Sequence, residues 1–273
     1  MHNWTETHRA FVNTWECDEN DHLNVQFYLK RFDEAARIFG IVTGTGTVDQ
    51  PLPKTRHVRY HNELRPCALT RISTSRISNG TFAGWVVHRL EDKSLNRLAA
   101  TAVDTPGAIG GEAGVDAADV DYALPRGLPD DHLRPRLAEA VLQSGGLVAH
   151  RSIVTPAECD ETGRMSQQFY VYRFTDAAPH VWENYGIGEP WLTANGYGRA
   201  AVEMKITHHE AARSGDMLFI YSRAERAGRK TIKLRHDVIR EIDQTPIASS
   251  EVLALILDLK TRKSVPLPDN FGD

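Results

Sequence analysis

Residues 15–40 read WECDENDHLNVQFYLKRFDEAARIFG, a polar segment that leads into an amphipathic one. In the second part, apolar side chains recur at spacings of four and three, which places them on one face of a helix. This apolar face is formed by Tyr28, Phe32, Ala36 and Phe39. The opposite face carries Lys30, Arg31, Glu34 and Arg37. Charged residues in such positions normally meet solvent. The stretch predicts a helix of roughly fifteen residues, preceded by a loop that holds potential acids and bases.

The same stretch occurs a second time in the chain. Residues 149–182 align without a gap on residues 7–40, and the tetrapeptide ECDE at 16–19 recurs at 158–161. Coincidence does not produce runs like these in register. The chain is therefore interpreted as an internal duplication.

Length and composition limit the number of domains and the classes of partner. The repeat divides the 273 residues into an N-terminal domain at 1–130, a linker helix at 131–147 and a C-terminal domain at 148–273. The formal net charge of −4 provides no basic surface for nucleic acid or an anionic membrane, so neither is an expected partner. No apolar run approaches the roughly 20 residues that cross a bilayer.

Cysteine usage and the N-terminal segment bear on the compartment. Three cysteines form no disulfide framework. The opening segment MHNWTETHRAF lacks the basic and apolar regions of a secretory signal. A reducing, cytoplasmic location is the simplest prediction.

The order of elements predicts an α+β fold. After the first helix, residues 69–77 and 81–90 read as two strands joined by Ser78-Asn79-Gly80, a hairpin signal. The Gly- and Ala-rich segment 106–120 is expected to be a mobile excursion. The second copy repeats strand, loop, helix and strands. Each half should be a curved antiparallel sheet wrapped around one long helix, because that sheet is the only partner for the helix's apolar face.

The loop pattern identifies a family by resemblance. The spacing Asp18-x-x-x-His22-x-Asn24-x-x-x-Tyr28 resembles the hotdog-fold acyl-CoA thioesterases of the 4-hydroxybenzoyl-CoA thioesterase type, whose loop commonly reads D-x-x-G-H-V-N-N-x-x-Y. Asp21 stands where the family usually has Gly. The resemblance covers nearly the whole chain, in two copies.

The second copy keeps only part of this pattern. Asp160, Gly163 and Tyr170 match it, whereas Arg164 and Ser166 replace the His and the Asn. Arginine is a permanent cation and cannot act as a neutral base. The second loop is therefore expected to contribute mainly to binding or structure, and turnover to depend on the first.

The resemblance implies two tandem hotdog domains, active sites at the junction of two units, and hydrolysis of an acyl thioester with no metal and no cofactor beyond the coenzyme A moiety of the substrate. It also implies that Asp18 acts as nucleophile or general base. Predicted catalytic residues are Asp18, His22, Asn24 and Asp160. Predicted substrate-binding residues are Tyr28, Arg164 and Arg59. Further association of such chains into a homo-oligomer is expected.

Physical chemistry is compatible with these roles. An Asp just ahead of a helix lies near unpaired backbone N–H groups, which can hold the oxygen of a thioester carbonyl. Such a donor contributes roughly 3 kcal/mol to stabilising the developing negative charge. The carboxylate can then attack the carbonyl or take a proton from water.

Plainer interpretations stay open beside these. Asp18 and Asp160 could cap helices or form turns, and His22 and Asn24 could merely orient the loop. Arg56, Arg59 and Arg71 could meet the phosphates of coenzyme A or could simply be solvated. Two other functions remain: an enoyl-thioester hydratase, although that family's loop usually has a Pro shortly before the His, and a non-catalytic acyl-thioester binding protein.

Overall fold

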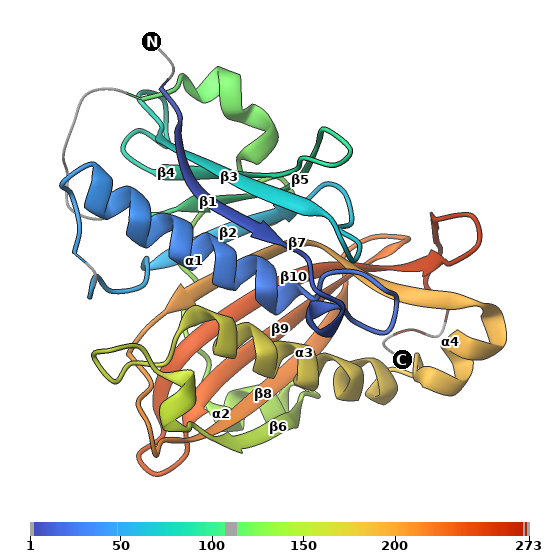
Figure 1. The fold of residues 1–273 in the computed structure, drawn as a ribbon. Coiled ribbons are helices and arrows are strands. Elements are labelled where there is room, and N and C mark those ends of the chain that lie inside the picture. Colours follow the sequence, from blue (N-terminus) through green and yellow to red (C-terminus); the bar gives the residue numbers. More distant parts are fainter. Residues whose placement is uncertain (1–2, 48, 107–113, 270, 272–273) are drawn as a thin grey trace. The chain divides into compact units, whose positions relative to one another are not determined.

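Two compact units make up the chain in the computed structural model (Figure 1), which describes residues 3–47, 49–106, 114–269 and 271. The first unit comprises Met1–Asp130 together with Ser166–Gln168. The second comprises Asp131–Met165 and Phe169–Asp273.

The first unit is an antiparallel sheet with one long helix packed on it. Its strand order is β1-β3-β4-β5-β2, and α1 lies against β1, β3 and β4. The elements in chain order are β1 (Thr5–Phe11), η1 (Thr14–Glu16), α1 (Val25–Val42), β2 (Thr55–Tyr60), β3 (Leu69–Arg76), β4 (Val86–Asp92), β5 (Arg97–Asp104) and η2 (Ala117–Ala123).

The second unit has the same strand order, β6-β8-β9-β10-β7, with β11 added beside β10. Its long helix is α3, whose first two residues group with the first unit. The elements are α2 (Ala138–Gln143), β6 (Leu147–Ile153), η3 (Pro156–Glu158), α3 (Gln167–Asn184), α4 (Glu189–Asn195), β7 (Tyr197–His208), β8 (Met217–Arg226), β9 (Thr231–Arg240), β10 (Thr245–Asp258) and β11 (Lys263–Val265). A shared strand order is what duplication of one unit produces.

Helix α1 begins and buries its face largely as its sequence predicts. The Asn24 side chain accepts a hydrogen bond from the Gln26 amide and caps the helix. Tyr28, Phe32 and Phe39 are buried. The prediction that Arg31 meets solvent is wrong, because the residue is only 2% exposed.

The burial of Arg31 has a clear cause. Its guanidinium lies 3.0 Å from the Glu16 carboxylate and donates to the Phe11 carbonyl, so it fixes η1 and the end of β1 to the helix. Arg173 of α3 makes the same ion pair with Glu158, also at 3.0 Å. Helical periodicity detects apolar faces and cannot detect a buried ion pair.

The β3–β4 hairpin exists, but its connection is longer than predicted. β4 begins at Val86 instead of residue 81, and residues 77–85 form an irregular loop. The Asn79 amide group holds this loop by donating to Asp116 at 2.7 Å and accepting from the Ala117 amide at 2.8 Å. The Asn79 side chain therefore binds the distant segment at 116–117, and the predicted tight turn does not form.

Part of the segment expected to be mobile is packed in the core. Val115 pairs with Ile77 in a parallel bridge, and Val115 and Val120 are buried against residues of β4 and β5. Residues 107–113, which also belong to the predicted excursion, lie outside the described residues. The prediction is thus wrong for the part from Gly114 onward.

The predicted linker helix is shorter than expected, since α2 starts only at Ala138. Residues 131–137 before it have no regular secondary structure and are held against β7: the Lys205 ammonium lies 3.0 Å from Asp131, and the Leu133 amide donates to the Thr207 hydroxyl. Across the described ranges, no helix combines the length and apolar character needed to cross a bilayer.

Candidate active site

The loop of Asp18 is a tight turn between η1 and α1. The Asp18 amide donates to the His22 carbonyl at 2.8 Å, and Cys17 pairs with Leu23 across the turn. The Leu23 amide in turn donates to the Leu64 carbonyl at 2.8 Å, which ties the loop to the segment before β3. These backbone bonds place Asp18 and His22 side by side.

The Asp18 carboxylate is held through one oxygen. Its Oδ1 accepts from the amides of Asn20 at 2.9 Å and His22 at 3.2 Å. Among the described residues, Oδ2 has no hydrogen-bond partner. Burial raises the pKa of Asp18, the two amide bonds oppose this, and the charge of Asp21 adds to the increase. A carboxylate that is held in one orientation and has a raised pKa is suited to accept a proton or to attack an electrophile.

His22 is buried, and its ring meets a carboxylate that the sequence reasoning did not single out. His22 Nε2 lies 3.1 Å from Glu63 Oε2. Glu63 follows β2, and its backbone carbonyl accepts from the Arg97 guanidinium at 2.7 Å. A carboxylate beside an imidazole orients the ring and stabilises its protonated form. Glu63 carries no local motif, so only the fold reveals it.

Asn24 acts in the structure as the cap of α1. Its Oδ1 accepts from the Gln26 amide at 3.1 Å, and its carbonyl accepts from the Phe27 amide at 2.9 Å. Of the first three helix amides, only that of Val25 is left without a partner among the described residues. The group available to hold a carbonyl oxygen here is therefore the Val25 N–H.

The structure gives Tyr28 and Arg59 structural contacts. Tyr28 is 4% exposed, and its hydroxyl accepts from the Leu64 amide at 3.3 Å. Arg59 donates to the carbonyl of Leu124, at 3.1 Å, after η2. Neither has a described contact with the Asp18 carboxylate, so their predicted roles in substrate binding stay predictions.

The Asp160 loop has the same backbone path but a different electrostatic state. Asp160 Oδ1 accepts from the Thr162 amide, the Thr162 hydroxyl at 2.6 Å and the Arg164 amide at 3.1 Å. Arg164 Nε lies 3.8 Å from Oδ2. Burial alone would raise the pKa of Asp160, but these hydrogen bonds and the Arg164 charge hold it below its usual value.

Hydrogen bonds show which residues correspond between the two loops. Leu64 and Ala212 play the same part, since each amide donates to the buried Tyr of its unit and each carbonyl accepts from the loop. The residue before each is Glu63 in the first unit and Ala211 in the second. The Asp–His–Glu set is thus present in the first unit, and the second keeps only its Asp.

Within the described ranges, no group of three or more His, Cys, Asp or Glu side chains could hold a metal ion.

Comparison with known families points to thioesterases. Residues 154–273 match the model of the thioesterase-like superfamily, and this region contains the Asp160 loop. A search of the curated proteins found no match.

Solved thioesterases share the fold along nearly the whole chain. An acyl-ACP thioesterase from Bacteroides thetaiotaomicron is 11% identical, with 92% of this chain and 98% of that chain covered and a TM-score of 0.62. A putative oleoyl thioesterase from Lactobacillus plantarum is 10% identical, with 98% and 99% covered and a TM-score of 0.62. The 12:0-ACP thioesterase from Umbellularia californica is 8% identical, with 92% and 93% covered and a TM-score of 0.58.

Identities this low establish the fold alone, which is that of the hotdog thioesterases. Together with the family match, they support a thioester hydrolase. The narrower resemblance to the 4-hydroxybenzoyl-CoA thioesterase type stays a prediction.

Proposed function

We propose that the chain is a tandem pair of hotdog units that hydrolyses an acyl thioester to a free acid and a thiol at the Asp18 loop. The observation that carries the proposal is the Asp18 carboxylate, whose Oδ1 is fixed by the Asn20 and His22 amides in the same loop that holds the His22–Glu63 pair. In the second unit, Arg164 and Ala211 take the positions of His22 and Glu63.

In the proposed reaction the thioester carbonyl oxygen lies at the start of α1, where the Val25 N–H and the helix dipole stabilise developing negative charge. Asp18 Oδ2 either attacks the carbonyl carbon or takes a proton from the attacking water. We expect the His22 ring, which lies beside Glu63, to hydrogen-bond to that water. If Asp18 attacks, the C–S bond breaks and a mixed anhydride forms, which water then cleaves to the free acid and the restored Asp18 carboxylate. If Asp18 acts as base, water attacks the carbonyl directly and the C–S bond breaks. In either route the leaving thiolate takes up the proton that water releases.

Coenzyme A is the proposed thiol carrier, as in the family that the loop resembles. Two of the solved structures with this fold are an acyl-ACP thioesterase and a 12:0-ACP thioesterase, which makes acyl carrier protein (ACP) the second candidate carrier. Matched acyl groups presented on the two carriers would distinguish them by kcat/KM.

The test is a thiol-release assay over acyl-CoAs of different length and polarity, with wild type and Asp18→Asn. Asparagine preserves the shape of Asp18 but is neither nucleophile nor base. We expect kcat to fall at least ~100-fold, the lower range for positioned acid–base groups.

Asp160→Asn is the matched control, because it makes the same chemical change on the equivalent turn. It should cost much less activity. A full loss from Asp160→Asn alone would reverse the assignment, and equal losses would mean two working sites. Addition of water to an enoyl-CoA without thiol release would instead identify a hydratase, and binding without turnover would identify a carrier-binding protein.

A further inference from the structure

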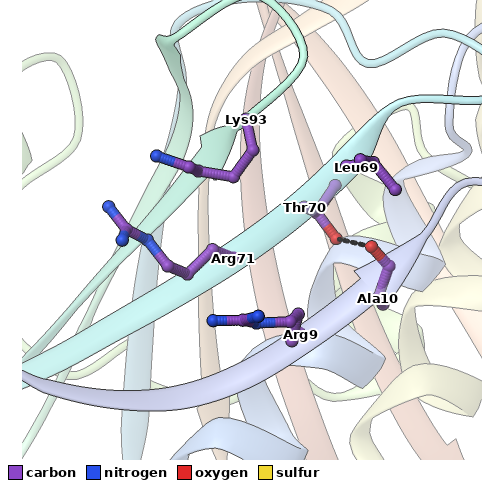
Figure 2. Close-up of a pocket in the computed structure, with 6 residues that line it drawn as sticks. All are labelled: Arg9, Ala10, Leu69, Thr70, Arg71 and Lys93. Carbon is purple, nitrogen blue, oxygen red and sulfur yellow. Dashed lines mark hydrogen bonds between the residues drawn. The ribbon is translucent and has the colours of Figure 1, made fainter.

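A small pocket opens on the face of the first unit's sheet where β1, β3 and the turn after β4 meet. Its volume is about 220 Å³, and it is lined by Arg9, Ala10, Leu69, Thr70, Arg71 and Lys93. Figure 2 shows the charged ends of Arg9, Arg71 and Lys93 extending to the same side. The volume is below the ~300–1,000 Å³ of pockets for drug-sized ligands, so the pocket fits one compact group.

Positive charge exceeds negative charge around the pocket. Arg9 and Arg71 share the Glu6 carboxylate, at 2.6 Å and 4.0 Å. The Glu91 carboxylate lies 2.6 Å from Arg71 and is also shared with a further Arg of β4. Two carboxylates thus serve three guanidinium groups. The Lys93 ammonium has no side-chain partner among the described residues.

The same sheet face is apolar beside the charges. Phe11 and Leu69 are cross-strand partners, and each lies two residues from an Arg of the pocket, so all four side chains share one face. Phe11 is 44% exposed and Leu69 is 54% exposed. A ligand with a charged head and an apolar body would match this arrangement.

The second unit preserves the apolar part and has lost the charged part. The register places Ile153 opposite Met217, as Phe11 lies opposite Leu69. Phe219 takes the position of Arg71, and Arg151 stacks over its ring at 5.1 Å. The Glu241 amide donates to the Met217 carbonyl as the Lys93 amide donates to the Leu69 carbonyl. The second unit therefore has Glu241 at the position that Lys93 occupies in the first unit.

We infer that the pocket of Arg9, Arg71 and Lys93 binds a phosphate group, most tightly that of a phosphate monoester with an apolar body. An anion that contacts all three cationic side chains at once must present several exposed oxygens. A phosphate monoester presents three terminal oxygens and close to two negative charges, whereas a carboxylate presents two oxygens and one charge. Each guanidinium has five N–H donors, more than its carboxylate partner occupies, and Lys93 adds the uncompensated charge.

The inference does not rest on the proposed hydrolysis, because binding is measured without an acyl thioester. Calorimetric titration at low salt and about pH 8, where the phosphate is a dianion, would use inorganic phosphate, phenyl phosphate and benzoate as probes. We expect saturable binding in the order phenyl phosphate, inorganic phosphate, benzoate. Inorganic phosphate binding as tightly as phenyl phosphate would assign the site to the free ion; benzoate binding as tightly as phenyl phosphate would overturn the inference.

Variants assign the binding to this pocket. Lys93→Gln should weaken phenyl phosphate binding about fivefold or more, the effect of one unit charge near 4 Å in water. Arg71→Phe installs the residue of the second unit and should weaken phenyl phosphate binding at least about tenfold.

Lys54→Gln is the matched control, since Lys54 is also exposed and unpaired among the described residues but precedes β2. Equal weakening by Lys93→Gln and Lys54→Gln would show non-specific charge attraction and overturn the inference. Thermal unfolding of each variant checks that the fold is intact.

Discussion

Asp21 adopts a backbone conformation that glycine reaches more easily. Its φ is 57°, and the equivalent Gly163 has φ 75°. Left-handed backbone is disfavoured for residues with a Cβ, although Asp and Asn tolerate it better than most. The first copy therefore keeps a carboxylate where the turn itself favours Gly, and that carboxylate contributes to the raised pKa of Asp18.

Asp21→Gly should move the acidic limb of the pH–rate profile to lower pH. Removing the Asp21 charge lowers the pKa of Asp18, and the active form is the carboxylate, which is present above that pKa. The measurement is kcat/KM against pH with a saturated acyl-CoA. Asp21→Asn removes the same charge and retains a side chain, so it should shift the limb equally; an unmoved limb in both variants would exclude Asp18 as the titrating group.

Asp18 and Asp160 should affect stability in opposite directions. A raised folded-state pKa means that ionised Asp18 opposes folding above its unfolded pKa, so Asp18→Asn should increase the free energy of unfolding at pH 7. The lowered pKa of Asp160 means that its carboxylate stabilises the fold above its unfolded pKa and loses this effect as pH falls through the folded pKa. Asp160→Asn should therefore decrease the free energy of unfolding at pH 7, by about 1 kcal/mol for a charged hydrogen-bonded group. Urea unfolding of both variants would test the sign, and changes of the same sign would refute the contrast.

At the level of elements, β2 and β5 are joined by a buried ion pair that the second unit lacks. Arg56 is fully buried and donates two hydrogen bonds of 2.6 Å to Asp104, which also lies 3.2 Å from His88. Burial alone would raise the pKa of Asp104, but Arg56 and His88 hold it well below its usual range. This pairing corrects the idea that Arg56 meets a substrate phosphate. In the second unit, Met204 and Val252 are the corresponding pair.

Exchange of this ion pair for its apolar counterpart should be tolerated, whereas removal of one partner should not. Asp104→Val removes the carboxylate that the buried guanidinium is paired with and should lower the free energy of unfolding by about 3–5 kcal/mol. Arg56→Met with Asp104→Val recreates the second unit's pair and should change stability much less. A double-mutant cycle in urea gives the coupling energy. Additive losses in the double variant would contradict the expectation.

The order of elements was accessible from the sequence because strands alternate and helices repeat on scales that a short window detects. The loop motif likewise pointed to Asp18 and His22. Glu63 was not accessible, because its meeting with His22 depends on how the chain returns before β3. Arg31 and Arg56 were misjudged for a related reason: a charge is buried only when a distant carboxylate reaches it, and no local pattern records that partner.

At the scale of the whole molecule, the two units share one strand order, whereas several of their charged residues differ. The buried rings are conserved in place: His88 packs on Phe32, and His236 packs on Phe174. Each of these histidines also contacts a hydroxyl of the neighbouring strand. The differences concern charge, at the loop acids, at the buried ion pair and at the cationic pocket. The core contacts found in both units thus maintain the fold. The candidate functions depend on charged residues that only one unit has.

The grouping of Ser166–Gln168 with the first unit has a consequence for the nascent chain. When the ribosome has released Asp130, the amide of Gln167 that accepts from Arg56 has not yet been made. Residues 131–168 follow at roughly 5–20 residues per second, which leaves a delay of about 2–8 s. During that interval the buried Arg56 lacks one of its acceptors. The hydrogen bond from Arg56 to Gln167 can therefore form only when synthesis of the C-terminal half is already under way.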